Sequence, residues 1–95
     1  MSDYVYIPTD ILEELANDAM EQGMTIRAYL NYICEKHIEE VLYLHDQGVS
    51  KNEVPVQWYP SEKLQSDISV AMSKLNVSEK AIVMECIKRY RKERS

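Results

Sequence analysis

The sequence predicts a mostly α-helical fold in which two short strands are each followed by a pair of helices. The first observation behind this prediction is an internal repeat, in which YVYIPTDILEELANDAMEQGMTIRAYLNYICEKHI is matched by VQWYPSEKLQSDISVAMSKLNVSEKAIVMECIKRY. The second is the order that both copies share: a run of aromatic and β-branched residues, a Pro followed by Thr or Ser, an amphipathic segment, a break and a second amphipathic segment. At 95 residues, the chain can form one compact domain with a small core.

The two aromatic and β-branched runs, at 4–7 and 54–59, are typical of strands. Pro8 and Pro60 close them. Because each run is too short to be stable as a lone strand, the two are expected to pair.

A first helix is expected after each strand. Thr9 and Ser61 stand where an N-cap belongs, and Asp10 and Glu62 suit the positive end of the helix dipole. The expected buried face has residues three and four positions apart: Ile11, Leu15, Ala19 and Gln22 in the first copy, and Leu64, Ile68, Met72 and Leu75 in the second.

A second helix follows in each copy. Gly23 and Asn76 tolerate the left-handed backbone that ends a helix, and Thr25 and Ser78 are the expected caps of the next one. The broad apolar faces of these helices predict a central position in the fold: Ile26, Tyr29, Leu30, Ile33, Cys34 and Ile38, and Ala81, Ile82, Met84, Cys86, Ile87 and Tyr90. The first of them is expected to run on through Glu39 to about His45.

These segments predict a first repeat at 1–46, a linker at 47–53 and a second repeat at 54–95, which together form one compact domain. The alignment of the repeats leaves one question open. Matching the Pro-Thr and Pro-Ser pairs puts the copies 52 positions apart, whereas matching the breaks between helices puts them 53 apart. Which alternate residues of the second strand face outward therefore stays open.

Composition limits the classes of function. No run approaches the roughly 18 apolar residues of a membrane span, and the start MSDYVYIP has no signal-like region, so a cytoplasmic protein is expected. Cys34 and Cys86 fall within apolar helical patterns and are expected to be reduced core thiols. Because there are only two glycines and no recognisable nucleophile grouping, neither catalysis nor a cofactor is predicted.

Charge is distributed unevenly along the chain. Residues 1–48 contain two basic and ten acidic side chains, a net charge of −8, and residues 49–95 contain nine basic and six acidic ones, a net charge of +3, which together give the −5 of the whole chain. Since cations supply most non-specific affinity for nucleic acid, the second half is expected to be the better DNA-binding half.

The strand, the Pro-Thr pair, the Gly-Met-Thr break and the second helix resemble the ribbon-helix-helix (MetJ/Arc/CopG-like) superfamily, and the likeness covers nearly the whole chain twice. The tandem arrangement is similar to the two-copy members among conjugation accessory proteins. The resemblance implies a β-α-α-β-α-α chain that forms an intramolecular pseudo-dimer, with a two-stranded antiparallel β-ribbon above four interlocked helices. It also implies sequence-specific binding of double-stranded DNA, as a transcriptional regulator or nucleoprotein accessory factor, by insertion of the ribbon in the major groove.

Alternation along the strands selects the candidate base contacts. If Val5 and Ile7 face the core, Tyr4 and Tyr6 face outward. In the second strand, the two alternating sets are Val54, Val56 and Trp58, and Pro55, Gln57 and Tyr59. The expected base contacts are Tyr4, Tyr6, Gln57 and Tyr59. Of these, Gln57 can bond adenine through both of its amide groups.

The N-termini of the second helices are the expected phosphate sites, because each offers backbone amides, a hydroxyl and one cation. The residues concerned are Thr25, Arg27, Ser78 and Lys80. The basic run from Lys88 to Arg94 could also reach a phosphate backbone, although such a run is usually a solvated helix end. Further self-association of the protein on DNA would be consistent with the charged linker.

Two other functions stay open. The protein could instead be an acidic interaction or inhibitor protein that keeps the same fold and binds a basic protein partner through its first half. A metal site built from Cys34, His37 and His45, or acid and base chemistry by Glu35, Glu39 and Glu40, can be imagined, but neither set forms a recognised motif, so no metal is predicted.

Overall fold

The computed structural model describes residues 4–41 and 52–94. In chain order, the elements are β1 (Tyr4–Pro8), α1 (Thr9–Glu21), α2 (Ile26–His37), the short 3-10 helix η1 (Ile38–Glu40), β2 (Glu53–Gln57), α3 (Glu62–Leu75) and α4 (Glu79–Arg94). The fold is mostly helical with one two-stranded antiparallel sheet, as the sequence predicted. No helix within the described ranges is long and apolar enough to cross a membrane.

The two strands form a ribbon with one buried and one exposed face. Tyr4 is paired with Gln57, Tyr6 with Pro55, and Ile7 with Val54. Val5 and Ile7 are buried, whereas Tyr4 and Tyr6 are about half exposed. This period-2 alternation is the strand pattern expected from the sequence, and it leaves an aromatic outer face.

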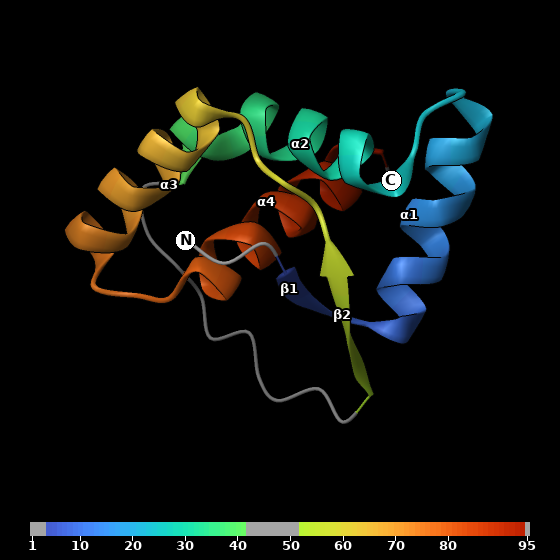
Figure 1. Cartoon of the computed structure of the whole chain (residues 1–95), viewed down its shortest axis with the longest axis horizontal. Helices are drawn as coiled ribbons and strands as arrows, with labels where there is room; N and C mark the ends of the chain where they lie inside the picture. The colour runs from blue at the N-terminus through green and yellow to red at the C-terminus, as the bar shows by residue number, and fades with distance from the viewer. Residues whose placement is uncertain (1–3, 42–51, 95) are drawn as a thin grey trace.

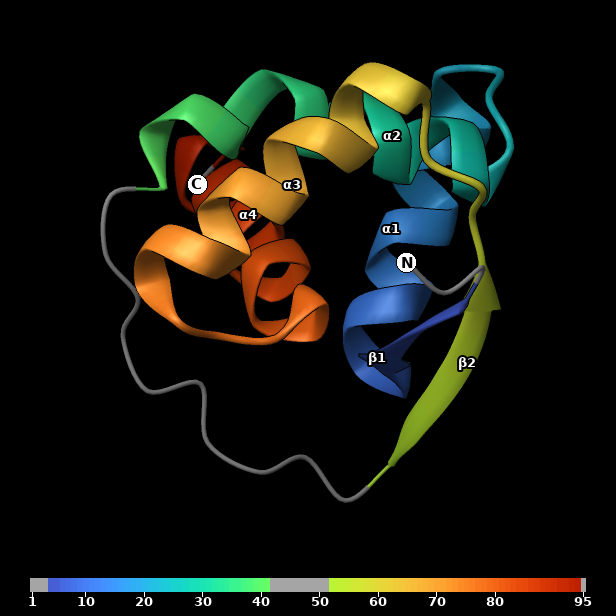
Figure 2. The ribbon, with the colours of Figure 1, turned by 60° about the vertical axis from the view of Figure 1, so that its left-hand side comes forward.

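The core lies between the buried ribbon face and the four helices. Figure 1 shows α2 and α4 crossing in the middle of the molecule, with α1 on one side and α3 on the other, and Figure 2 shows the ribbon at one edge of this arrangement. The largest core side chain is Trp58, which is fully buried directly after β2. The core also contains the predicted faces of the helices, including Leu15, Leu30, Ile68 and Ile87, which are 1% exposed or less.

The helix N-caps decide between the offsets of 52 and 53 positions that the alignment of the two repeats left open. Ser61 is the N-cap of α3 and accepts a hydrogen bond from the Leu64 amide, but the N-cap of α1 is Pro8 and not Thr9, which is already the first helical residue. The prediction for Thr9 was therefore wrong, and its amide donates instead to the Asn52 carbonyl, at 2.8 Å.

Positions with the same structural role are 53 residues apart. This separation holds for the N-caps Pro8 and Ser61 and for the N-caps Thr25 and Ser78, whose hydroxyls accept from the amides of the third residue beyond. It also holds for the left-handed residues Gly23 and Asn76. The match of Pro-Thr with Pro-Ser at 52 positions was a coincidence of sequence.

Several predicted boundaries and faces were wrong by a few residues. Helix α2 ends at His37 and passes through η1 to Val41, whose backbone is no longer helical, so it does not run on to His45. Strand β2 begins at Glu53, inside the predicted linker, and ends at Gln57. The rest of that linker, at 47–51, lies outside the described residues. Gln22 is exposed, because it lies at the end of α1.

A polar cluster fastens the end of α4 to α1 and α2. The Tyr90 hydroxyl donates to Asp18 Oδ2 at 3.1 Å and accepts from Arg94 at 3.0 Å, and it also contacts the Tyr29 hydroxyl. Arg94 is ion-paired with Asp18. Burial is the main reason why the pKa of Tyr90 is raised, and the hydrogen bond with Tyr29 raises it further. The cluster gives a buried carboxylate the partners that it needs.

Replacement of Asp18 by Ala should lower the free energy of unfolding by about 1–3 kcal/mol, because two donors then lose their acceptor in a buried setting. Urea unfolding followed by circular dichroism measures the change. The matched control is Glu13→Ala, an exposed position on the same helix, which should have almost no effect. Equal losses from the two substitutions would mean that the cluster does not stabilise the fold.

Candidate nucleic-acid interface

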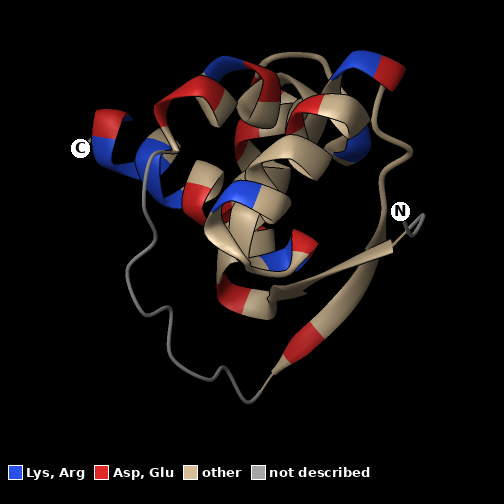
Figure 3. Cartoon of the chain, turned by 90° about the vertical axis from the view of Figure 1, so that its left-hand side faces the viewer, with Lys and Arg blue, Asp and Glu red and all other residues tan. Residues whose placement is uncertain are grey.

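The outer ribbon face carries the four predicted base-contacting side chains. Tyr4, Tyr6 and Tyr59 have 51%, 53% and 49% of their surface exposed, and Gln57 is exposed as well. The outward set of the second strand is therefore Pro55, Gln57 and Tyr59, while Val54, Val56 and Trp58 face inward. On this face, Glu53 at the start of β2 is the one charged residue within the two strands as described, and it is the acidic position at that end of β2 in Figure 3.

Three of the exposed groups form a connected chain. The Tyr59 hydroxyl accepts a hydrogen bond from Gln57 Nε2. The guanidinium of Arg27 lies over the Tyr59 ring, with its carbon 5.9 Å from the ring centroid. A cation at this distance is attracted to the face of an aromatic ring. The predicted phosphate contact Arg27 is thereby joined to the predicted base contacts Gln57 and Tyr59.

Asn31 on α2 holds the backbone on both sides of Tyr59. Its Nδ2 donates to the Trp58 carbonyl and its Oδ1 accepts from the Ser61 amide, both at 3.0 Å. This bracket matters because Tyr59 has a φ of 40°, a conformation that costs free energy in a residue with a bulky side chain. The role of Asn31 was not predicted from the sequence, where the only signal was an amide side chain next to the core residue Leu30.

The N-termini of α2 and α4 lie at the two ends of β2. Arg27, in the first turn of α2, contacts Tyr59 just beyond the end of the strand. Lys80, in the first turn of α4, is paired with Glu53 at the start of the strand, with Nζ 2.6 Å from Oε1. These two contacts place the helix N-termini, and with them the predicted phosphate contacts Thr25, Arg27, Ser78 and Lys80, beside the ribbon. One of the two cations, Lys80, is neutralised there by Glu53, a role that was not predicted from the sequence.

The basic run at the end of α4 lies away from the ribbon (Figure 2). Arg91 is paired with Glu14 at 2.9 Å, Arg94 with Asp18, and Arg89 with Glu85 at 3.4 Å. These cations neutralise carboxylates, two of them on α1, so part of the charge difference between the halves is compensated within the molecule. The basic run from Lys88 to Arg94 is therefore the C-terminal end of α4, which packs against α1.

Cys34 and His37, which the sequence offered as metal ligands, are buried in the core. Cys34 and Cys86 are buried free thiols, and their mutual hydrogen bond, together with burial, raises the pKa of Cys34. His37 is buried, with Nδ1 3.0 Å from Glu40 and Nε2 3.2 Å from Glu93, and its hydrogen bond lowers the pKa of Glu40. His45 lies outside the described residues. Within the ranges 4–41 and 52–94, no group of three or more His, Cys, Asp or Glu could hold a metal ion.

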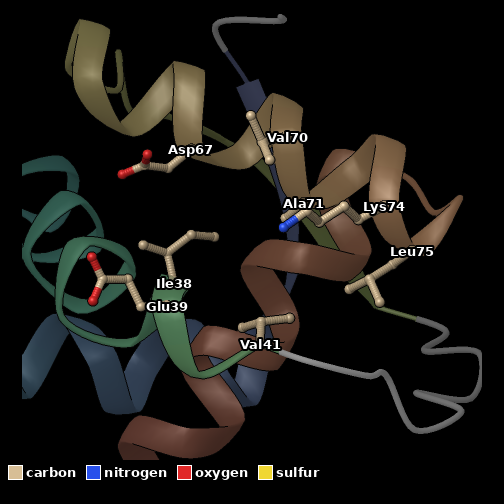
Figure 4. Close-up of a pocket in the computed structure, with 8 residues that line it drawn as sticks. All are labelled: Ile38, Glu39, Val41, Asp67, Val70, Ala71, Lys74 and Leu75. Atoms are coloured by element: carbon tan, nitrogen blue, oxygen red, sulfur yellow. The ribbon is translucent and has the colours of Figure 1, made fainter.

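A shallow groove of about 460 Å³ lies between η1 and α3 (Figure 4). Its lining is mainly apolar, with Ile38, Val41 and Leu75 among the residues that form it. Two carboxylates, Glu39 and Asp67, and one ammonium group, that of Lys74, also line the groove. Glu39 of the predicted acidic cluster therefore lies beside apolar groove surface, whereas Glu35 of that cluster accepts a hydrogen bond from the Ser61 hydroxyl.

Comparison with known proteins adds no relative. No family model, curated protein or solved structure matches this chain. The interface is therefore interpreted from its own geometry and chemistry.

Replacement of Asn31 by Ala should lower the free energy of unfolding by about 1 kcal/mol, because a part-buried carbonyl and an exposed amide lose their partner beside the strained residue Tyr59. Thermal unfolding measures the loss. Asn17→Ala, at an exposed position of α1, is the control and should be near neutral. If the two variants unfold alike, Asn31 does not hold this segment in place.

Proposed function

We propose that this protein binds double-stranded DNA sequence-specifically by inserting the β1–β2 ribbon in the major groove, and that its two halves form an intramolecular ribbon-helix-helix pseudo-dimer. One observation carries the proposal: an exposed two-stranded ribbon, with Glu53 as its one charged strand residue in the described range, has the N-terminus of a helix, with a capping hydroxyl and a cation, at each end of β2. The separation of 53 residues between equivalent caps supports the pseudo-dimer.

The outer face suits the edges of base pairs. A major groove about 12 Å wide admits a two-stranded ribbon, and its base pairs differ there in their donors, acceptors and methyl groups. The amide of Gln57 offers a donor and an acceptor to adenine. The tyrosines offer one hydroxyl each, and rings that can contact thymine methyl groups. A face of this composition favours selectivity over strong general attraction.

The helix N-termini suit phosphate. The hydroxyls of Thr25 and Ser78 accept from the amides of Ala28 and Ala81, which leaves each hydroxyl hydrogen available to a phosphate oxygen. Free amides and the positive end of the helix dipole add to the attraction. Because Arg27 stands at one helix N-terminus and Lys80 at the other is paired with Glu53, the dependence of log K on log salt should have a slope of only about −1.

The first test is selection from a random pool of double-stranded DNA at moderate and at low salt. Enrichment of a short motif that is lost in Gln57→Ala and Tyr59→Ala is the expected result. Lys63→Ala, an exposed substitution on α3, is the control and should keep the motif. If nothing is retained, even at low salt, the DNA-binding proposal is wrong.

Glu53→Gln should tighten DNA binding, because it releases Lys80 from its ion pair at the ribbon. The slope of log K against log salt should become steeper by up to about 1. Fluorescence anisotropy over a series of salt concentrations measures both effects. The control Glu62→Gln removes the same charge in the first turn of α3, and equal tightening by both variants would show a general charge effect only.

The groove between η1 and α3 supports a second candidate function, the binding of a basic, partly apolar protein segment. Its apolar lining and its two carboxylates, Glu39 and Asp67, which outnumber the one cation Lys74, carry this alternative. Replacement of these two residues by Gln and Asn should then abolish partner capture and leave DNA binding unchanged. The Gln57 and Tyr59 variants would behave in the opposite way if the ribbon is the functional surface.

A further inference from the structure

The two halves of the outer ribbon face can be superimposed in sequence. A separation of 53 residues relates 4–7 to 57–60, and burial repeats at each position. The exposed pairs are Tyr4 with Gln57 and Tyr6 with Tyr59, and the buried pairs are Val5 with Trp58 and Ile7 with Pro60. The separation that relates the helix caps therefore also relates the segment 4–7 to 57–60, of which Gln57 is the last residue of β2.

The strand register places the centre of this arrangement. Tyr4 is paired across the ribbon with Gln57, which is also its counterpart in the other half. A residue can face its own counterpart only on the axis that relates the two halves. Tyr6 and Tyr59 then lie two residues from the centre in opposite directions, Tyr6 within β1 and Tyr59 just beyond the end of β2.

Equivalent positions on the two sides of this axis carry similar side chains, whereas the two residues that lie on the axis carry different ones. The outer positions hold Tyr6 and Tyr59, and the helix N-termini hold the equivalent pairs Thr25 with Ser78 and Arg27 with Lys80. At the centre, a tyrosine stands beside a glutamine. Apart from Pro55 and Glu53, this is the chemical difference between the halves on the described outer face.

We infer that the protein reads a DNA site whose outer base pairs are related by twofold symmetry and whose centre is asymmetric, and that the Tyr4–Gln57 pair fixes the orientation of the protein on the duplex. The inference rests on the DNA-binding function proposed above. It assigns specificity at the central base pairs to these two side chains.

The contacts of Gln57 make it the stronger of the two readers. Its Nε2 donates one hydrogen to the Tyr59 hydroxyl, which leaves the second N–H and the carbonyl oxygen for adenine. Tyr59 is itself held by Arg27 and by the bracket of Asn31, so the amide is oriented before DNA arrives. Tyr4 can offer only a single hydrogen bond or a ring contact to the other DNA strand.

Selection with matched variants tests the centre. The wild type should enrich motifs with symmetric outer positions and an asymmetric centre. Tyr4→Gln and Gln57→Tyr make the two central residues identical, and each should enrich a motif that is symmetric throughout, with about tenfold loss of preference for the wild-type centre. Circular dichroism confirms that these surface variants stay folded.

The exchange Tyr4→Gln with Gln57→Tyr tests orientation. It should bind the wild-type motif turned by 180°. A dye on Met20→Cys, at a residue of α1 that is 77% exposed, should transfer energy to an acceptor at one DNA end in the wild type and to the opposite end in the exchanged protein. A dye on Val70→Cys of α3 is the matched probe from the other half, while the buried Cys34 and Cys86 stay unlabelled.

The outcomes separate the two proposals. A wild-type motif that is symmetric through its centre, or an exchanged protein that keeps its orientation, would overturn the inference and leave DNA binding in place. If no DNA is selected at low salt, the proposed function fails and the inference fails with it. Symmetric motifs in both single variants and a reversed orientation in the exchange establish it.

Discussion

The pairing of β1 with β2 is the constraint on which the rest of the structure depends. A five-residue strand cannot satisfy its own backbone groups, so each strand needs the other, although the two begin 49 positions apart in the chain. The pairing brings the two halves together and closes the core over Val5, Ile7 and Trp58. It also fixes which side chains face outward, because a slip of one residue would exchange the two faces.

The uneven charge of the chain has a structural use. Cations near the end of α4 meet carboxylates of α1, through Arg91 with Glu14 and Arg94 with Asp18. The latter pair is joined to the buried hydroxyl of Tyr90, so this contact does more than an exposed ion pair, which contributes little by itself. The ribbon is left almost uncharged, with Arg27 and Lys80 at its margins. Sequence preference would then depend on hydrogen bonds and shape more than on net charge.

The sequence alone predicted much of the fold, because the alternation in YVYI and the three-and-four spacing of the helices are local signals. It predicted the outward tyrosines for the same reason. It misplaced the cap at Thr9, since two similar Pro pairs suggested a register that differs from the true one by a residue. The roles of Asn31 and Glu53 could not be predicted, because each depends on a partner more than 25 positions away: Trp58 and Ser61 for the first, and Lys80 for the second.

The central claim is that the outer ribbon face and the two helix N-termini form one DNA-binding surface. Amide chemical-shift mapping by nuclear magnetic resonance, with a selected duplex added to the labelled protein, tests it most directly. The largest chemical-shift changes are expected in β1, in β2 and the following residues as far as Tyr59, and at the starts of α2 and α4. Little change is expected in η1 and α3. Changes confined to the groove between η1 and α3, with the ribbon unaffected, would contradict it.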